Sequence, residues 1–109
     1  MRKTELVKGI TEMIILTFLD VKDMYGYELS SKVNKASEGY IMLKEGTLYP
    51  LLKKLEEKGF IESYSAVSKE GPQRKYYKLS TEGKAELNRQ KKEWSIFQSE
   101  LIKLLFYTE

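Results

Sequence analysis

The chain has 109 residues, 41% of them hydrophobic, and carries a net charge of +3 with neither cysteine nor histidine. This length corresponds to one small domain. Without cysteine there is no disulfide framework or thiolate metal site, and without histidine the commonest general base and metal ligand are missing. Because a Gly-rich phosphate loop is also absent, the sequence disfavours an enzyme, and we expect no metal and no cofactor.

The most apolar run of the sequence covers residues 13–19. It is too short to span a bilayer, which takes about 20 apolar residues. No signal peptide is apparent either. We therefore expect a cytoplasmic protein without a membrane partner.

The basic excess of the chain is concentrated in residues 44–78, which hold eight basic and five acidic residues. The remaining residues balance at eleven of each sign. A local excess of this kind is expected of a surface that contacts nucleic-acid phosphates, and it also fits a mildly basic surface without a partner.

Two helices are predicted before this basic region. The first spans residues 4–20, with Thr4 as its N-cap, and its apolar stripe is so wide that the helix should be buried on most sides. Those sides can face the core or a second subunit. The second helix runs from about Tyr25 to Ala36, and Gly26 near its start indicates a close approach to another helix.

Three residues are assigned to the buried side of the second helix: Tyr27, Leu29 and Val33. The loop that follows ends at Gly39. Residues 40–43 are then predicted to form a short strand against a later hairpin.

A short helix with a marked start and stop is predicted within residues 45–59. Thr47 is its expected N-cap, Pro50 falls in its first turn, and Gly59 is the left-handed residue past its end. One face is apolar, with Leu48, Leu51, Leu52 and Leu55. The other face carries Tyr49, Lys53, Lys54 and Lys58. The helix is either a recognition helix for a DNA groove or an ordinary surface helix with solvated lysines.

A hairpin follows this helix. Residues 60–67 are rich in aromatic and β-branched side chains, residues 68–73 form a Gly-Pro turn, and residues 74–79 are predicted to form the returning strand. By alternation Tyr77 shares the core face with Leu79, which leaves Tyr76 to contact phosphate or to stack elsewhere. A helix followed by a basic hairpin is the layout of a winged helix.

The last helix is predicted to begin after Ser80 as N-cap and to run to the C-terminus, about 28 residues or roughly 40 Å. Its apolar residues repeat every seven positions, which indicates a seam facing a second copy of the chain or, alternatively, the first helix of the same chain. The residues expected at a dimer interface are Leu6, Ile10, Leu87, Trp94, Phe97, Leu101, Leu104 and Leu105.

Several stretches, in the right order, resemble the PadR family of bacterial transcriptional regulators. They are Tyr25–Leu29, Glu45–Leu52, Leu55–Ile61, Gly71–Leu79 and Thr81–Gly83. The similarity covers about residues 6–90. The single C-terminal helix resembles the shorter subfamily, because the larger helical domain of the longer subfamily is absent.

The resemblance implies a mainly α-helical fold with a small β-hairpin. Residues 1–79 would form a winged helix-turn-helix DNA-binding domain, and residues 80–109 a dimerisation helix. A homodimer would bind double-stranded DNA at a near-palindromic promoter operator, most often as a repressor. The implied DNA contacts are Thr47, Tyr49, Lys53, Lys54, Lys69, Gly71, Arg74, Lys75 and Tyr76.

Some shorter members of the family bind planar drugs or flavins between their subunits, where a tryptophan of each C-terminal helix stacks on the ligand. Trp94 is the only tryptophan here and lies on the predicted seam near Phe97. The resemblance therefore implies a planar hydrophobic or aromatic effector, while Trp94 could equally fill a closed dimer core. A different class of function is a protein–protein interaction module, since winged helices also serve as protein docks.

Overall fold

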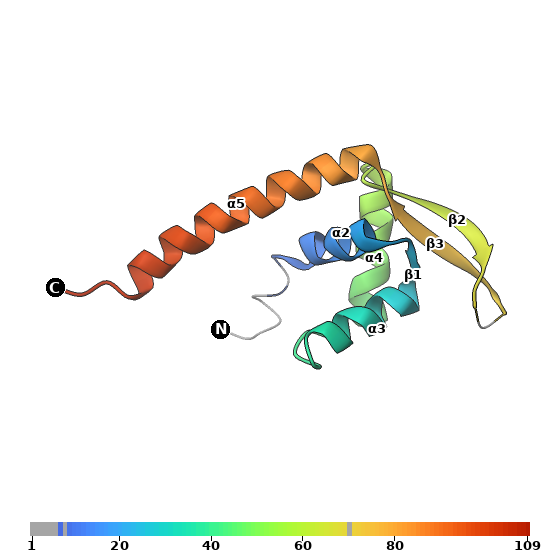
Figure 1. Cartoon of the computed structure of the whole chain (residues 1–109), viewed down its shortest axis with the longest axis horizontal. Helices are drawn as coiled ribbons and strands as arrows, with labels where there is room; N and C mark the ends of the chain where they lie inside the picture. Colours follow the sequence, from blue (N-terminus) through green and yellow to red (C-terminus); the bar gives the residue numbers. More distant parts are fainter. Residues whose placement is uncertain (1–6, 8, 70) are drawn as a thin grey trace.

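The computed structural model describes residues 7, 9–69 and 71–109 and shows a small helical body with one long projecting helix (Figure 1). The elements are α2 (Thr11–Val21), β1 (Met24–Tyr25), α3 (Gly26–Ala36), α4 (Glu45–Glu57), β2 (Ile61–Val67), β3 (Gln73–Leu79) and α5 (Thr81–Leu105). The β2–β3 hairpin leaves the body on one side and α5 on the other. This is the winged helix-turn-helix fold with a long C-terminal helix that the sequence predicts.

The core lies where the body helices meet the root of the hairpin and the first turns of α5. Leu48, Leu52 and Leu55 of α4 are at most 1% exposed, which confirms the predicted apolar face of that helix. Leu87 of α5 joins the same core and is fully buried. The other buried apolar residues are Ile15, Leu16, Leu19, Met24, Leu29, Val33, Leu43, Ile61 and Tyr77. This burial holds α4 in place and leaves its opposite face in solvent.

The first predicted helix, residues 4–20, is not continuous in the structure. Gly9 and Ile10 form a turn, and α2 begins only at Thr11. The turn is closed by the Ile10 N–H and the Thr11 hydroxyl, which both donate to the Val7 carbonyl oxygen at 2.9 and 2.7 Å. Gly9 favours this break, since glycine is a poor helix former. The proposed Thr4 cap lies outside the described residues.

The sheet has three antiparallel strands in the order β1-β3-β2. Within the hairpin Ile61 pairs with Leu79 and Val67 with Gln73, so the predicted wing is confirmed. The third strand is β1. The prediction that residues 40–43 form a strand against the hairpin was wrong. The backbone of residues 40–43 is held by serine side chains instead. Ser30 donates to the Leu43 carbonyl oxygen, and the Ile41 N–H donates to Ser37.

Helix α4 starts earlier than its sequence suggests. Lys44 occupies the N-cap position, and the Thr47 N–H donates to the Lys44 carbonyl oxygen at 2.9 Å, so Thr47 is not the cap. Pro50 therefore lies in the second turn, where its nitrogen has no hydrogen to donate to the carbonyl of the exposed Gly46.

The end of α4 is as predicted. Gly59 adopts a left-handed φ of 81°. The Phe60 N–H donates to the Leu55 carbonyl oxygen and the Gly59 N–H to that of Glu56, both at 3.0 Å, which closes a Schellman motif. The chain then turns directly into β2.

The start of α5 is also as predicted. The Ser80 hydroxyl accepts the Gly83 N–H at 3.0 Å and donates to the Gly59 carbonyl oxygen at 2.6 Å. Ser80 thus caps α5 and fastens it to the end of α4. The helix ends at Leu105, short of the predicted C-terminus, and its 25 residues extend about 37 Å.

Candidate nucleic-acid interface

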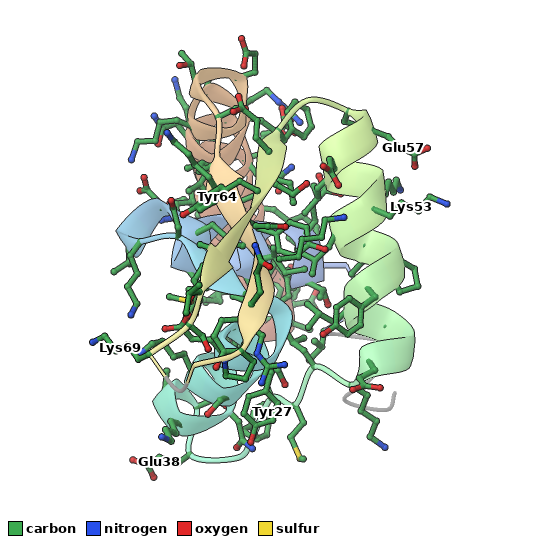
Figure 2. All side chains as sticks on the ribbon, turned by 90° about the vertical axis from the view of Figure 1, so that its right-hand side faces the viewer. Tyr27, Glu38, Lys53, Glu57, Tyr64 and Lys69 are labelled. Carbon is green, nitrogen blue, oxygen red and sulfur yellow. The ribbon has the colours of Figure 1, made fainter. Side chains whose placement is uncertain are left out.

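The outer face of α4 carries the side chains predicted to meet DNA. Thr47, Lys53 and Lys54 are exposed, and Tyr49 is 43% exposed. Figure 2 shows Lys53 and Glu57 projecting from the side of α4 that points away from the hairpin. Because the core anchors the opposite face of α4, these side chains are presented on a rigid support.

The start of α3 fits closely against Tyr49. A Cβ atom at Gly26 would lie 2.6 Å from the Tyr49 hydroxyl oxygen and 2.8 Å from two ring carbons. This confirms the close approach that Gly26 was predicted to mark. The contact positions the Tyr49 ring near the junction of α3 and α4, at the N-terminal end of the outer face.

The wing tip is a tight turn stabilised by Ser68. The N–H and the hydroxyl of Ser68 both donate to the Pro72 carbonyl oxygen at 2.9 Å, and Gly71 has a φ of 105° that favours glycine. Lys69 lies at the far end of the hairpin in Figure 2. No atom would lie within 4 Å of a Cβ at Gly71, so the tip is open to a partner.

Tyr76 stacks within the protein. Its ring lies 5.7 Å from that of Tyr64 at an interplanar angle of 15° and meets Tyr25 edge-on at 5.5 Å. The guanidinium carbon of Arg74 lies 5.3 Å from the centre of the Tyr25 ring. This cluster ties the wing to β1. Tyr76 was expected either to contact phosphate or to stack on other side chains, and in the structure it stacks. Tyr77 is buried on the core face, as predicted.

A hydrogen bond at the same cluster joins Tyr64 to the body of the protein. The Tyr64 hydroxyl donates to the Asp23 carboxylate, and this bond raises the pKa of Tyr64 to about 12. The hairpin is therefore held at its middle by a hydrogen bond as well as by stacked rings.

Glu56 connects α4 to the wing. Its carboxylate accepts the Ser63 hydroxyl of β2 and lies 3.7 Å from the Lys75 ammonium of β3. Lys75 also lies 5.5 Å from the centre of the Tyr77 ring, whose burial raises the pKa of Tyr77. Through these contacts Glu56 joins α4 to both strands of the wing.

Sequence reasoning missed a basic cleft between α3 and the wing tip. Tyr27 was assigned to the buried side of α3 but is 73% exposed, because two positions along a helix turn a side chain by about 200° from Leu29. The cleft has a volume of about 390 Å³. Its lining residues are Lys22, Asp23, Tyr25, Tyr27, Glu28, Ser31, Lys32, Lys35, Lys69 and Tyr76. The spacing of Tyr27, Ser31 and Lys35 is the signal that could have revealed this polar face.

A second cleft, of about 340 Å³, lies between the start of α2 and the middle of α5. Ile10, Trp94 and Phe97, which the sequence placed at the dimer seam, line it together. The Trp94 and Phe97 rings are 5.9 Å apart, and Trp94 is 39% exposed. The cleft also includes Glu12, which accepts a hydrogen bond from Gln90 and lies 3.8 Å from the Lys58 ammonium.

The other predicted seam residues are placed differently from one another. Leu104 and Leu105 are 74% and 68% exposed, and Leu101 is half-buried. Leu87 is fully buried in the core of its own chain and has no surface left for a partner. Leu6 lies outside the described residues.

Comparison with known proteins identifies the family of this chain and finds solved structures with the same fold. The sequence profile of the transcriptional regulator PadR-like family matches residues 15–89, from α2 to the first turns of α5. This chain belongs to the PadR-like family. The profile covers α4 and the wing.

Relatives and solved structures of PadR proteins match nearly the full chain. A Lysinibacillus sphaericus protein, described only as uncharacterized, is 37% identical over 95 residues, 87% of each chain. A PadR-like transcriptional regulator from Bacillus cereus is 34% identical with a TM-score of 0.83, covering 95% of this chain and 99% of that one. A PadR family transcription regulator from Clostridium difficile is 40% identical with a TM-score of 0.78, covering 88% and 98%.

Members of the PadR family are transcriptional regulators and not enzymes, as the composition predicts. Within the part of the chain that the structure describes, no three potential metal-ligating side chains are grouped around a common point. Among the same residues, no helix combines the length and the apolar character that crossing a bilayer requires.

Proposed function

We propose that this PadR-family regulator is a homodimeric repressor that binds a near-palindromic promoter operator through α4 and the wing. The observation that carries the proposal is the outer face of α4, where Lys53 and Lys54 are exposed on a helix whose inner face is locked in the core. Lys53 and Lys54 neutralise phosphates, while Thr47 and Tyr49 approach the bases from the N-terminal end of the helix.

The wing supplies the second set of DNA contacts. Lys69, Arg74 and Lys75 are exposed along one hairpin, and the Gly71 turn lets the tip approach a duplex closely. Since the stacked tyrosines fix the hairpin to the body, the distance between α4 and the wing tip is preset. Such preset contacts favour one register on the DNA.

The second copy of the chain binds along α5. Support comes from the exposed surface of α5 and of the two residues after it, which carry several large apolar side chains. They are Trp94, Ile96, Phe97, Ile102, Leu104, Leu105, Phe106 and Tyr107, each at least 39% exposed. A two-fold contact along α5 covers such a surface and spaces two recognition helices about one helical turn of DNA apart.

The effector of the proposed repressor is a planar hydrophobic molecule at the dimer interface. Trp94 and Phe97 offer two aromatic faces in a cleft at the proposed seam. A ligand that binds two dimer shapes with different affinity changes the separation of the recognition helices and so releases the DNA. Replacing Trp94 by alanine should abolish this response and leave the dimer intact.

An interaction module for proteins is the second candidate function, since the winged helix presents the same face to either kind of partner. The exposed lysines of α4 favour DNA. In a protein dock, replacement of Lys53 would have no systematic effect on the affinity for duplex DNA.

The test is a binding titration of the full chain, at several salt concentrations, on the promoter DNA upstream of its own gene. The wild type should bind as a dimer, with an affinity that falls steeply with salt. Lys53→Ala should weaken binding, whereas Lys92→Ala, an exposed position on α5, should not. Binding to this promoter no tighter than to random duplex, and unaffected by Lys53→Ala, would contradict the proposal.

A further inference from the structure

The cleft between α3 and the wing tip has a composition suited to an anion. It contains four lysines and two carboxylates, and both carboxylates already have partners. Glu28 lies 2.9 Å from the Lys22 ammonium, and Asp23 accepts the Tyr64 hydroxyl. Within the described part of the chain, no ion pair joins Lys32, Lys35 or Lys69 to an acid.

Hydroxyl groups accompany these three lysines. Tyr27 is 73% exposed, and Ser31 follows it by one helical turn along α3. Hydroxyls and ammonium groups are among the side-chain groups that most often contact DNA phosphates. The cleft therefore combines charge from α3 and the wing tip with hydroxyl groups from α3.

The position of the cleft identifies the anion. If α4 occupies a major groove and the wing the neighbouring minor groove, one phosphate backbone must pass between them, because that backbone separates the two grooves. Figure 2 shows Tyr27 at the lower edge of the protein, between Lys69 at the wing tip and the N-terminal end of α4. Side chains that lie between the wing tip and α4 therefore face the phosphate backbone of the DNA.

We infer that Lys32, Lys35 and Lys69, with the hydroxyls of Tyr27 and Ser31, form a cleft that holds the phosphate backbone between the two grooves. This inference rests on the proposed function and assigns phosphate contacts to named side chains of α3 and the wing tip, which the predicted DNA contacts on α4 and the wing did not include, apart from Lys69. The contacts carry no base information, so they strengthen binding to any duplex and fix how deeply the wing and α4 enter their grooves.

The test compares two double variants with the same change of charge. Lys32→Ala/Lys35→Ala removes two cations from the cleft, and Lys91→Ala/Lys92→Ala removes two exposed cations from α5. The probes are the promoter duplex and a random-sequence duplex of equal length. Circular dichroism and thermal unfolding check that both variants fold as the wild type does.

The cleft variant should bind both duplexes about tenfold more weakly, with a salt slope lower by about 0.9 for each phosphate that is no longer neutralised. Lys32→Arg/Lys35→Arg should keep the wild-type slope, since arginine retains the charge. If the cleft variant and the α5 variant show the same decrease in affinity and slope while Lys53→Ala still weakens binding, the inference is wrong and the proposed function stands. If the wild type shows no salt-dependent DNA binding, both are overturned.

Discussion

Gly83, in the first turn of α5, lies directly against the backbone of Phe60. A Cβ atom at Gly83 would be 1.9 Å from the Phe60 carbonyl oxygen and 2.7 Å from a methyl carbon of Leu79. The same carbonyl accepts the Ser80 N–H at 3.1 Å. The end of α4 and the start of α5 are thus joined through backbone atoms, which have little freedom to move apart.

Gly83→Ala should therefore destabilise the fold by about 1–3 kcal/mol, because the added methyl group must displace backbone. Gly46→Ala is the matched control, since a Cβ at Gly46 would meet no atom within 4 Å and alanine is the better helix former by up to about 1 kcal/mol. Denaturant unfolding measures both variants. Equal midpoints for the two would show that the junction tolerates a side chain.

Glu56→Gln should strengthen DNA binding at little cost in stability. The Glu56–Lys75 pair is partly exposed, so its removal costs about 1 kcal/mol at most, while the Lys75 ammonium is freed for a phosphate. The control is Glu100→Gln, which removes a carboxylate that also lies near a lysine ammonium, that of Lys103 on α5. A similar increase in DNA affinity in both variants would show that the effect comes from net charge alone.

Leu104→Glu should convert the proposed dimer to a monomer. Leu104 is 74% exposed and lies on the predicted seam, where a second copy would have to desolvate the new carboxylate. Asn88→Glu introduces the same charge at an exposed position of α5 that precedes the exposed apolar residues, which begin at Trp94, and should leave the dimer intact. Sedimentation velocity distinguishes the two. A dimeric Leu104→Glu protein would exclude this part of α5 from the interface.

Stability should fall on acidification through Glu86. Hydrogen bonds from Arg89 and Gln90 lower the pKa of Glu86 from 4.5 to about 2. Since the folded-state pKa is the lower one, this contribution is full above pH 4.5 and disappears as the pH falls towards 2.

The Glu86 contribution is about 1 kcal/mol at most, because Arg89 is largely exposed. Glu86→Gln should therefore show a shallower decrease of stability between these pH values, as measured by urea unfolding. Curves of the same shape for wild type and variant would assign the acid sensitivity to other carboxylates.

Some features were predictable because their signals are local. Gly59 ends α4 and Ser80 begins α5 through hydrogen bonds that span only a few residues, and both were identified from residue type and spacing. The alternation that places Tyr77 in the core follows from strand geometry alone.

Two predictions about the backbone were wrong, and one of them failed because contacts between distant residues decide the structure. Residues 40–43 have strand-forming side chains, but their polar backbone is satisfied by Ser30 and Ser37, and β3 pairs with β1 instead. Thr47 is a good cap residue, but the helix begins earlier, at Glu45. The first outcome depends on Ser30, thirteen residues before Leu43, and on the pairing of β3 with β1, which the local sequence does not show. The second is local, because the Thr47 N–H donates to the Lys44 carbonyl oxygen and no side chain caps the helix.

By itself, the sequence determined the order of the main helices and of the β2–β3 hairpin, the apolar face of α4 and the membership of the PadR family. These follow from periodicity, caps and motifs, which are properties of short segments. Only the tertiary structure decided which polar groups gather at one place. The cleft between α3 and the wing tip brings Lys69 together with Lys32 and Lys35, because the pairing of β1 with β3 places the hairpin beside α3. The burial of Leu87 in the core of its own chain was likewise set by packing, because its seven-residue spacing from Trp94 fits a seam with a second copy equally well.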